Sequence, residues 1–70
     1  MDILAKRLRE LRKERGLKQD ELAALLNISL SGYTRYEHGE RDPNAPTLVA
    51  MADFFQVSAD YLLGRKDQRE

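Results

Sequence analysis

Apolar residues recur along most of this chain at intervals of three and four, the period of a helix that buries one face. The first such segment covers residues 2–15, where the apolar positions are Leu4, Leu8 and Leu11. Asp2 is placed to cap the start of this segment, and Gly16 is placed to end it in a left-handed turn. We therefore expect an amphipathic helix over residues 2–15.

Two shorter helices are expected next, over residues 19–26 and 29–37. Their apolar positions are Leu22, Ala23, Leu26, Tyr33 and Tyr36. Asn27 lies at the turn between them, and asparagine tolerates positive φ better than most residues with a side chain. Ser29 is a good N-cap for the second helix. Gly32 inside that helix costs about 1 kcal/mol relative to alanine, which suggests either close approach by another surface or simple tolerance, and we favour tolerance.

Two further helices are expected in the C-terminal half. Their apolar positions are Leu48, Met51, Ala52, Phe55, Tyr61, Leu62 and Leu63. Asn44 is placed to cap the longer helix, which has Pro46 in its first turn and runs to about residue 55. Ser58 and Gly64 mark the two ends of the short fifth helix.

Together these segments predict an all-α fold, a compact five-helix domain over residues 1–64. Residues 65–70 are charged and have nothing to bury, so we expect this tail to fray. The two helices within residues 19–37 have the layout of a helix-turn-helix, with apolar inner faces and a small or polar outer face on the second helix. The second helix of such a pair can enter the major groove of DNA.

The composition narrows the possible classes of protein. A chain of 70 residues allows one domain, near the lower size limit for a core without disulfides or metals. The absence of cysteine excludes disulfides and suits a reducing cytoplasm, where we expect the protein to be. No apolar run approaches the roughly 20 residues of a membrane span, and the N-terminal segment is not a signal peptide.

The charges sum to zero but are unevenly distributed. Residues 1–17 hold six basic and three acidic side chains, whereas residues 42–64 hold three acidic and no basic ones. Any positive face must therefore be built from the first helix, the helix-turn-helix and the tail. His38 is the only histidine, and no cluster of possible ligands accompanies it, so we expect no metal, no cofactor, no small-molecule ligand and no catalysis.

Three motifs taken together resemble the helix-turn-helix family of the phage-repressor and Cro type. They are QDELA at residues 19–23, YEHG at residues 36–39 and VSADYLLG at residues 57–64. The resemblance covers residues 7–64 and implies a lambda-repressor-like domain that binds double-stranded operator DNA through its major groove, usually as a homodimer.

The resemblance also implies which side chains meet DNA. Base contacts are expected from Leu30, Ser31, Thr34 and Arg35. Arg35 is the strongest candidate because a guanidinium can bond guanine O6 and N7 together; the alternative is a solvated arginine or a partner for Glu40. Leu30 stands where a polar residue is common, although leucine could meet a thymine methyl. Phosphate contacts are expected from Lys18, Gln19, Ser29, His38 and Arg41. Gln19 lies at a helix start, where backbone N–H groups attract anions.

Two structural roles follow from the same resemblance. Arg12 and Glu37 are expected to form an ion pair that ties the first helix to the end of the third and fixes the angle of that helix. The last two helices carry more apolar surface than so small a domain is expected to hide, on Phe54, Phe55, Tyr61, Leu62 and Leu63. Either these residues close the core or part of them forms the dimer contact, which would place two recognition helices about 34 Å apart.

The function expected from these observations is that of a sequence-specific transcription regulator, a repressor on a short pseudo-palindromic operator. A restriction-modification controller or an antitoxin would use the same fold. The alternative from another class is a protein-interaction module that has lost DNA readout. Zero net charge and Leu30 favour that module, while Arg35, Gln19 and Arg41 oppose it.

Overall fold

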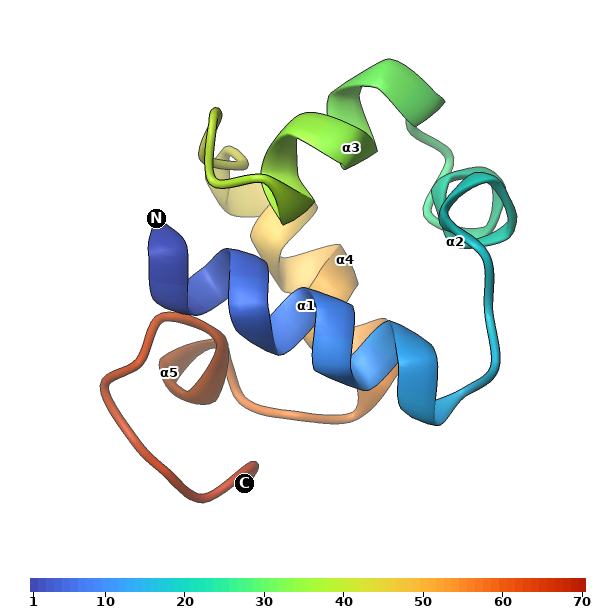
Figure 1. Cartoon of the computed structure of the whole chain (residues 1–70). Coiled ribbons are helices and arrows are strands. Elements are labelled where there is room, and N and C mark those ends of the chain that lie inside the picture. Colours follow the sequence, from blue (N-terminus) through green and yellow to red (C-terminus); the bar gives the residue numbers. More distant parts are fainter.

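The computed structural model describes all 70 residues and contains five α-helices and no strand (Figure 1). The helices are α1 (Asp2–Glu14), α2 (Gln19–Leu25), α3 (Leu30–Glu37), α4 (Ala45–Phe55) and α5 (Ala59–Leu62). The predicted all-α, five-helix fold is confirmed. None of the helices combines the length and the apolar character that crossing a membrane requires.

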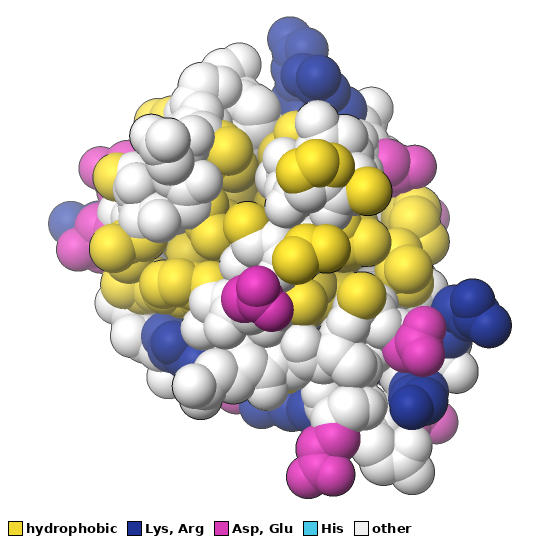
Figure 2. Space-filling view, turned by 180° about the vertical axis from the view of Figure 1, so that it is seen from behind, with side chains coloured by type: hydrophobic (Ala, Val, Ile, Leu, Met, Phe, Trp, Pro, Cys, Tyr) yellow, Lys and Arg dark blue, Asp and Glu magenta, His cyan; other side chains and the backbone are white.

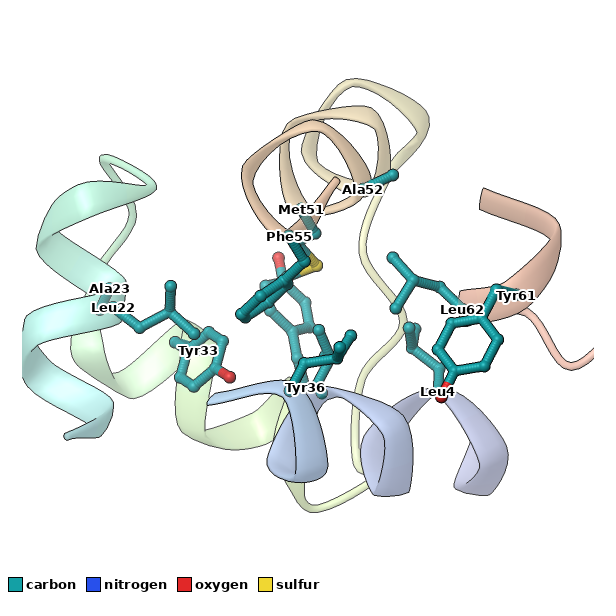
Figure 3. Packing of buried hydrophobic residues seen from close by; sticks show 12 residues of the cluster. Leu4, Leu22, Ala23, Tyr33, Tyr36, Met51, Ala52, Phe55, Tyr61 and Leu62 are labelled. Carbon is teal, nitrogen blue, oxygen red and sulfur yellow. The ribbon is translucent and has the colours of Figure 1, made fainter. Parts of the chain in front are cut away.

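The core lies between α1 and α4, with α2 and α3 at one end and α5 at the other (Figure 3). Helix α1 packs on α3 and α5, while α2 packs on α3. The core residues are Leu4, Leu8, Leu11, Leu22, Ala23, Tyr33, Tyr36, Met51, Ala52, Phe55, Tyr61 and Leu62. Each of them had been expected on the inner face of its helix, so the spacing of apolar residues predicted the core.

Three of the helix starts are capped by the side chains that the sequence predicted. Ser29 Oγ accepts from the N–H of Gly32 at 3.0 Å, Asn44 Oδ1 from Thr47 at 2.9 Å, and Ser58 Oγ from Tyr61 at 3.0 Å. The expectation that Asp2 caps α1 is wrong, because Asp2 is itself the first helical residue. Its carboxylate still lies in the first turn, where the helix dipole favours negative charge.

The interpretation of Gly32 as tolerated stays a prediction. A Cβ atom at this position would lie 3.0 Å from Ser29 Oγ, the atom that caps α3. That distance is tighter than ordinary van der Waals contact. At the same position of the caps of α4 and α5, however, Thr47 and Tyr61 carry a Cβ and still donate to the capping oxygen.

All five helices end in the same way, with one residue in the left-handed conformation. These residues are Gly16, Asn27, Gly39, Gln56 and Gly64. The N–H of each following residue bonds back across the last turn, from Leu17 to Arg12, Ile28 to Ala23, Glu40 to Arg35, Val57 to Ala52 and Arg65 to Asp60. This closure satisfies free carbonyls and reverses the chain within a few residues, which lets five helices fit into a short chain.

The tail, residues 65–70, is exposed but lies against the domain. The Arg69 guanidinium makes two hydrogen bonds to the Glu14 carboxylate, at 2.8 and 2.5 Å. The carbonyl of Arg69 accepts from the N–H of Ser58 at 2.6 Å. These contacts join the tail to α1 and to the start of α5, and the expected fraying stays a prediction.

The apolar residues of α4 and α5 mostly close the core. Phe55, Tyr61 and Leu62 are buried, while Phe54 and Leu63 are partly exposed. The large apolar residues that remain exposed are Met1, Leu25, Leu30 and Val49. Apolar side chains are spread across the face opposite to the view of Figure 1 (Figure 2). Little of α5 itself is therefore left for a dimer contact.

Candidate nucleic-acid interface

The position of α3 is set by a carboxylate at its last residue. Glu37 is completely buried, with none of its surface exposed. A buried charge is costly unless other groups pair with it and satisfy its oxygens by hydrogen bonds. The surroundings of Glu37 therefore show what holds the helix in place.

Three side chains donate to the Glu37 carboxylate, each from a different helix. Arg12 donates from Nε to Oε2 at 2.6 Å and from Nη2 to Oε1 at 3.2 Å. The hydroxyl of Tyr33 donates to Oε2 at 2.5 Å, and Gln19 Nε2 donates to Oε1 at 3.1 Å. The ion pair expected between Arg12 and Glu37 is thus present, and it is part of a larger network that joins α1, α2 and α3.

The backbone around this network is held as well. Arg9 Nη1 donates to the carbonyl of Glu37 at 2.5 Å, and Arg12 Nη1 donates to the carbonyl of Leu17 at 2.9 Å. A guanidinium next to the C-terminal end of α3 also interacts favourably with the negative end of the helix dipole. Two arginines of α1 therefore fix the end of α3.

The protonation states of the network follow from its contacts. Burial would raise the pKa of Glu37, but the hydrogen bonds from Arg12, Tyr33 and Gln19 outweigh it and hold that pKa below its ordinary value. Burial and the hydrogen bond to Glu37 raise the pKa of the Tyr33 hydroxyl. The hydrogen bond to Glu37 also raises the pKa of Arg12. At neutral pH the network therefore consists of a carboxylate, a neutral phenol and a charged guanidinium.

The basic residues of α1 contribute less to a positive surface than the sequence suggested. Arg7 lies over the ring of Tyr61, with 4.2 Å from Cζ to the ring centroid, and donates to the carbonyl of Tyr61. Arg9 and Arg12 donate to Glu37. These three arginines therefore make contacts within the fold. Charge patterning alone did not predict these contacts, because a long side chain can reach over apolar surface to a distant partner.

The outer face of α3 carries the four residues expected to contact bases. Leu30, Ser31 and Arg35 are exposed, and Thr34 is half-buried. Leu30 and Thr34 lie one turn apart on one edge of the face, while Ser31 and Arg35 lie one turn apart on the other.

Arg35 forms no ion pair with Glu40. The side chain that lies beside Glu40 is His38, with 3.9 Å between His38 Nδ1 and Glu40 Oε1. The guanidinium of Arg35 makes no hydrogen bond or ion pair within the chain. The alternative role for Arg35, as a partner of Glu40, is therefore not realised, and this side chain is available to an external acceptor.

The side-chain amide of Gln19 is engaged on both sides. Besides its bond to Glu37, its Oε1 accepts a long hydrogen bond of 3.4 Å from Thr34 Oγ1. An amide NH₂ has two donor hydrogens, so one N–H of Gln19 is left. A phosphate contact from this side chain would use that remaining N–H.

Carboxylates of the chain itself already bond two N–H groups at the start of α2, where the sequence suggested an anion site. Helix α2 has seven residues, and two carboxylates already occupy its first turn. Glu21 Oε1 accepts from the N–H of Lys18 at 2.8 Å, and Asp20 Oδ1 accepts from the N–H of Glu21 at 2.9 Å. These carboxylates satisfy part of the helix end, so a phosphate contact here would be made by side chains and stays a prediction.

The other residues expected to contact phosphate lie at the surface around α3. Lys18 is exposed ahead of α2, and Arg41 is exposed in the loop that follows α3. Figure 1 shows this loop and the start of α2 on opposite sides of α3. Ser29 keeps its hydroxyl proton as a donor while its Oγ caps the helix, and His38 is exposed at the end of α3. The structure thus leaves these four side chains accessible.

Comparison with known proteins supports the interpretation of α2 and α3 as a helix-turn-helix. Residues 8–62 match the sequence model of a family described as helix-turn-helix. The HTH-type transcriptional regulator ImmR of Bacillus subtilis is 42% identical over 64 residues, which are 91% of this chain and 50% of ImmR. The cryptic phage CTXphi transcriptional repressor RstR of Vibrio cholerae is 39% identical over 62 residues, 89% of this chain and 55% of RstR. The chain thus spans about half the length of these relatives.

Two solved structures share the fold. The DNA-binding domain of the P22 c2 repressor, determined by nuclear magnetic resonance, has a TM-score of 0.78 at 32% sequence identity, covering 86% of this chain and 79% of that one. The crystal structure of a transcriptional regulator from Vibrio cholerae has a TM-score of 0.77 at 31% identity, covering 93% of this chain and 36% of that one.

Proposed function

The chain belongs to the helix-turn-helix family of the phage-repressor type, and on that premise we propose that it is a cytoplasmic DNA-binding transcription regulator. More narrowly, it is a repressor that binds a short pseudo-palindromic operator as a homodimer. Each of the relatives above is named as a transcription regulator or repressor, and not as an enzyme.

One observation carries this proposal: the inner side of α3 is held by the Glu37 network, whereas its outer face has a side chain without a partner. The Glu37 network attaches its last residue to α1 and α2, while Arg35 on the outer face has no partner within the chain. A recognition helix needs this combination, because base readout requires a rigid support and side chains that are not already paired.

The contacts with DNA divide into two kinds. The base edges in the major groove are read by Leu30, Ser31, Thr34 and Arg35. The phosphates on either side are held by Lys18, Gln19, Ser29, His38 and Arg41. Phosphate contacts set the register of the protein on the duplex, and base contacts supply the discrimination. Occupation of the operator by two protomers, with their recognition helices about 34 Å apart, would exclude RNA polymerase.

Two alternatives are considered, and selection of bound DNA separates the second of them from the proposed function. A restriction-modification controller or an antitoxin would also bind a specific sequence, so its operator would differ only in genomic position. A protein-interaction module without DNA readout is favoured by the zero net charge and by the exposed Leu30. The unpaired guanidinium of Arg35 opposes it.

Selection of bound sequences from random duplex DNA, at a stated salt concentration, tests the proposal. We expect a palindromic consensus, which Arg35→Ala weakens at one guanine in each half-site. Arg65→Ala is the matched control, because this exposed arginine lies beyond α5 and should leave the consensus unchanged. Weak binding to all sequences, unaffected by Arg35→Ala, would instead support the interaction module.

A further inference from the structure

The first residue of the recognition helix is a leucine whose side chain has no place in the core. Leu30 is 47% exposed, whereas the other large apolar residues of α3, Tyr33 and Tyr36, are buried. In a helix-turn-helix the N-terminal residues of the second helix reach furthest into the groove. Leu30 therefore lies where an apolar side chain would meet base edges rather than solvent.

The two edges of the outer face differ in chemistry around Leu30. Thr34, one turn further along the same edge, has its hydroxyl proton directed to Gln19 Oε1. Ser31 and Arg35 on the other edge have no partner within the chain and keep their donors available. The face thus presents an apolar edge beside a hydrogen-bonding edge.

Thymine is the base that complements the apolar edge. Its C5-methyl group is the apolar feature of the major groove and lies beside the O4 acceptor, whereas adenine, guanine and cytosine present only donors or acceptors there. We propose, on the basis of the function proposed above, that Leu30 recognises a thymine methyl and that Arg35 recognises a guanine in the same half-site. The operator would then be defined by one apolar and one bidentate contact per half-site.

The distance between the two residues sets the spacing of the two bases. Leu30 and Arg35 are five positions apart on the helix, which corresponds to about 7.5 Å along its axis. Successive base pairs are separated by about 3.4 Å along the duplex. A helix that follows the groove is inclined to the duplex axis, so the thymine and the guanine are at most about two base pairs apart.

Replacement of thymine by deoxyuridine tests the inference directly, since it removes only the methyl group. Each thymine of the selected operator is replaced in turn, and dissociation constants are measured by fluorescence anisotropy at fixed salt. For the wild-type protein we expect one sensitive position per half-site, with affinity about fourfold lower, as for the loss of one buried methyl. Leu30→Ala should bind both operators equally well at that position.

Leu25→Ala is the matched control, because Leu25 is a similarly exposed leucine, at 58%, and lies on α2 rather than on the outer face of α3. This variant should keep the full sensitivity to deoxyuridine. A second variant, Leu30→Gln, should shift the preference at the sensitive position from thymine to adenine, which a glutamine bonds at N6 and N7.

The outcomes separate this inference from the proposed function. If a palindrome is selected but no deoxyuridine lowers affinity, or Leu30→Ala remains as sensitive as the wild type, then the thymine contact is overturned and the repressor function stands. If no specific sequence is selected at all, the proposed function fails and the thymine contact fails with it.

Discussion

Gln19 and Glu37 are joined by a hydrogen bond from Nε2 to Oε1 of 3.1 Å, which connects the first residue of α2 to the last residue of α3. The same amide accepts from Thr34 on the outer face of α3. A residue expected to touch a phosphate is thus also part of the support of the recognition helix. The position of the proposed phosphate contact and the angle of α3 would therefore be physically linked.

The substitution Gln19→Glu tests whether the side chains at positions 19 and 37 are in contact. In Gln19→Glu a second carboxylate lies next to that of Glu37, so one of the two is expected to have a raised pKa in the folded state. The variant should therefore have a melting temperature several degrees below that of the wild type at pH 7, and the difference should shrink as the pH falls towards 5. Thermal unfolding followed by circular dichroism measures both values.

Gln68→Glu makes the same chemical change in the exposed tail and serves as the control. Its melting temperature should stay close to that of the wild type at both pH values. An equal effect of the two substitutions would mean that net charge, and not the contact with Glu37, is responsible.

Removing the buried charge of Glu37 should destabilise the protein more than Gln19→Glu does. Glu37→Gln leaves Arg12 without its partner in a partly buried position, and breaking a buried pair in this way costs about 3–5 kcal/mol. A domain of this size is stable by about 4–10 kcal/mol in total. We therefore expect severe loss of stability in urea unfolding, whereas Tyr33→Phe, which removes one hydrogen bond, should cost about 1–2 kcal/mol. Glu40→Gln, at an exposed carboxylate, should change little.

The same network predicts the sign of the pH dependence. Because the folded-state pKa of Glu37 is lowered, its contribution to stability is complete above the ordinary carboxyl pKa and is lost as the pH falls through the folded-state value. Tyr33→Phe keeps the ion pair but loses one of the hydrogen bonds that lower this pKa, so its acid-induced loss of stability should be smaller and should be complete at a higher pH than in the wild type. A wild-type stability that does not change between pH 6 and 3 would contradict the assignment of Glu37 as a buried carboxylate.

The sequence predicted the core and the helix starts because these depend on local spacing and on single capping residues. It did not predict that Gln19 and Tyr33 meet Glu37, since such contacts depend on how three helices cross. Nor did it predict that Arg9 is used internally, because periodicity places a charged residue on a face without telling where a long side chain bends. The Arg12–Glu37 pair was found only through the family resemblance.

The sequence predicted that α4 ends at about residue 55, but not that Gln56 would end it in the left-handed conformation. Gln56 has φ of 56°, although glutamine has no particular preference for the left-handed region. The chain accepts this because Val57 must turn back onto the core, where it bonds to the carbonyl of Ala52. The strain is thus imposed by the packing of the following residue.

Relief of that strain should stabilise the protein. Gln56→Gly removes a side chain from a left-handed position, and we expect a gain of about 0.5–1 kcal/mol after the greater chain entropy of glycine is included. The control, Asp53→Gly, places glycine at an exposed site within α4 and should cost about 1 kcal/mol. Urea unfolding of both variants measures the difference, and a loss of stability in Gln56→Gly would show that the position is not strained.

Three arginines of α1 are engaged within the fold, so fewer cations are available to neutralise phosphates. We therefore expect DNA binding to depend only weakly on salt. With Arg7, Arg9 and Arg12 engaged, Lys18 and Arg41 are the main cations expected to neutralise phosphates. Each neutralised phosphate contributes about −0.9 to the slope of log K against log salt concentration, so we expect a slope of about −2 per protomer.

Titrations of the selected operator between 50 and 200 mM salt, values that span about a fourfold range, measure this slope. Lys18→Ala should reduce its magnitude by about 1 per protomer without changing the preferred sequence. Lys66→Ala, in the tail, should leave the slope unchanged. A wild-type slope much steeper than expected would mean that further cations of α1 reach the DNA.

The tail should depend on its pair with α1. The hydrogen bond from Arg69 lowers the pKa of Glu14, so this contact is complete above the ordinary carboxyl pKa and is lost as the pH falls through the lowered value. Exposed pairs of this kind add little to global stability. Deletion of residues 65–70 should therefore leave the cooperative unfolding of the domain intact, with a melting temperature only slightly lower.

Amide hydrogen exchange of Ser58, whose N–H donates to Arg69, should become faster in Arg69→Ala but not in Arg65→Ala. Fast exchange at Ser58 already in the wild type would mean that the tail is frayed at equilibrium.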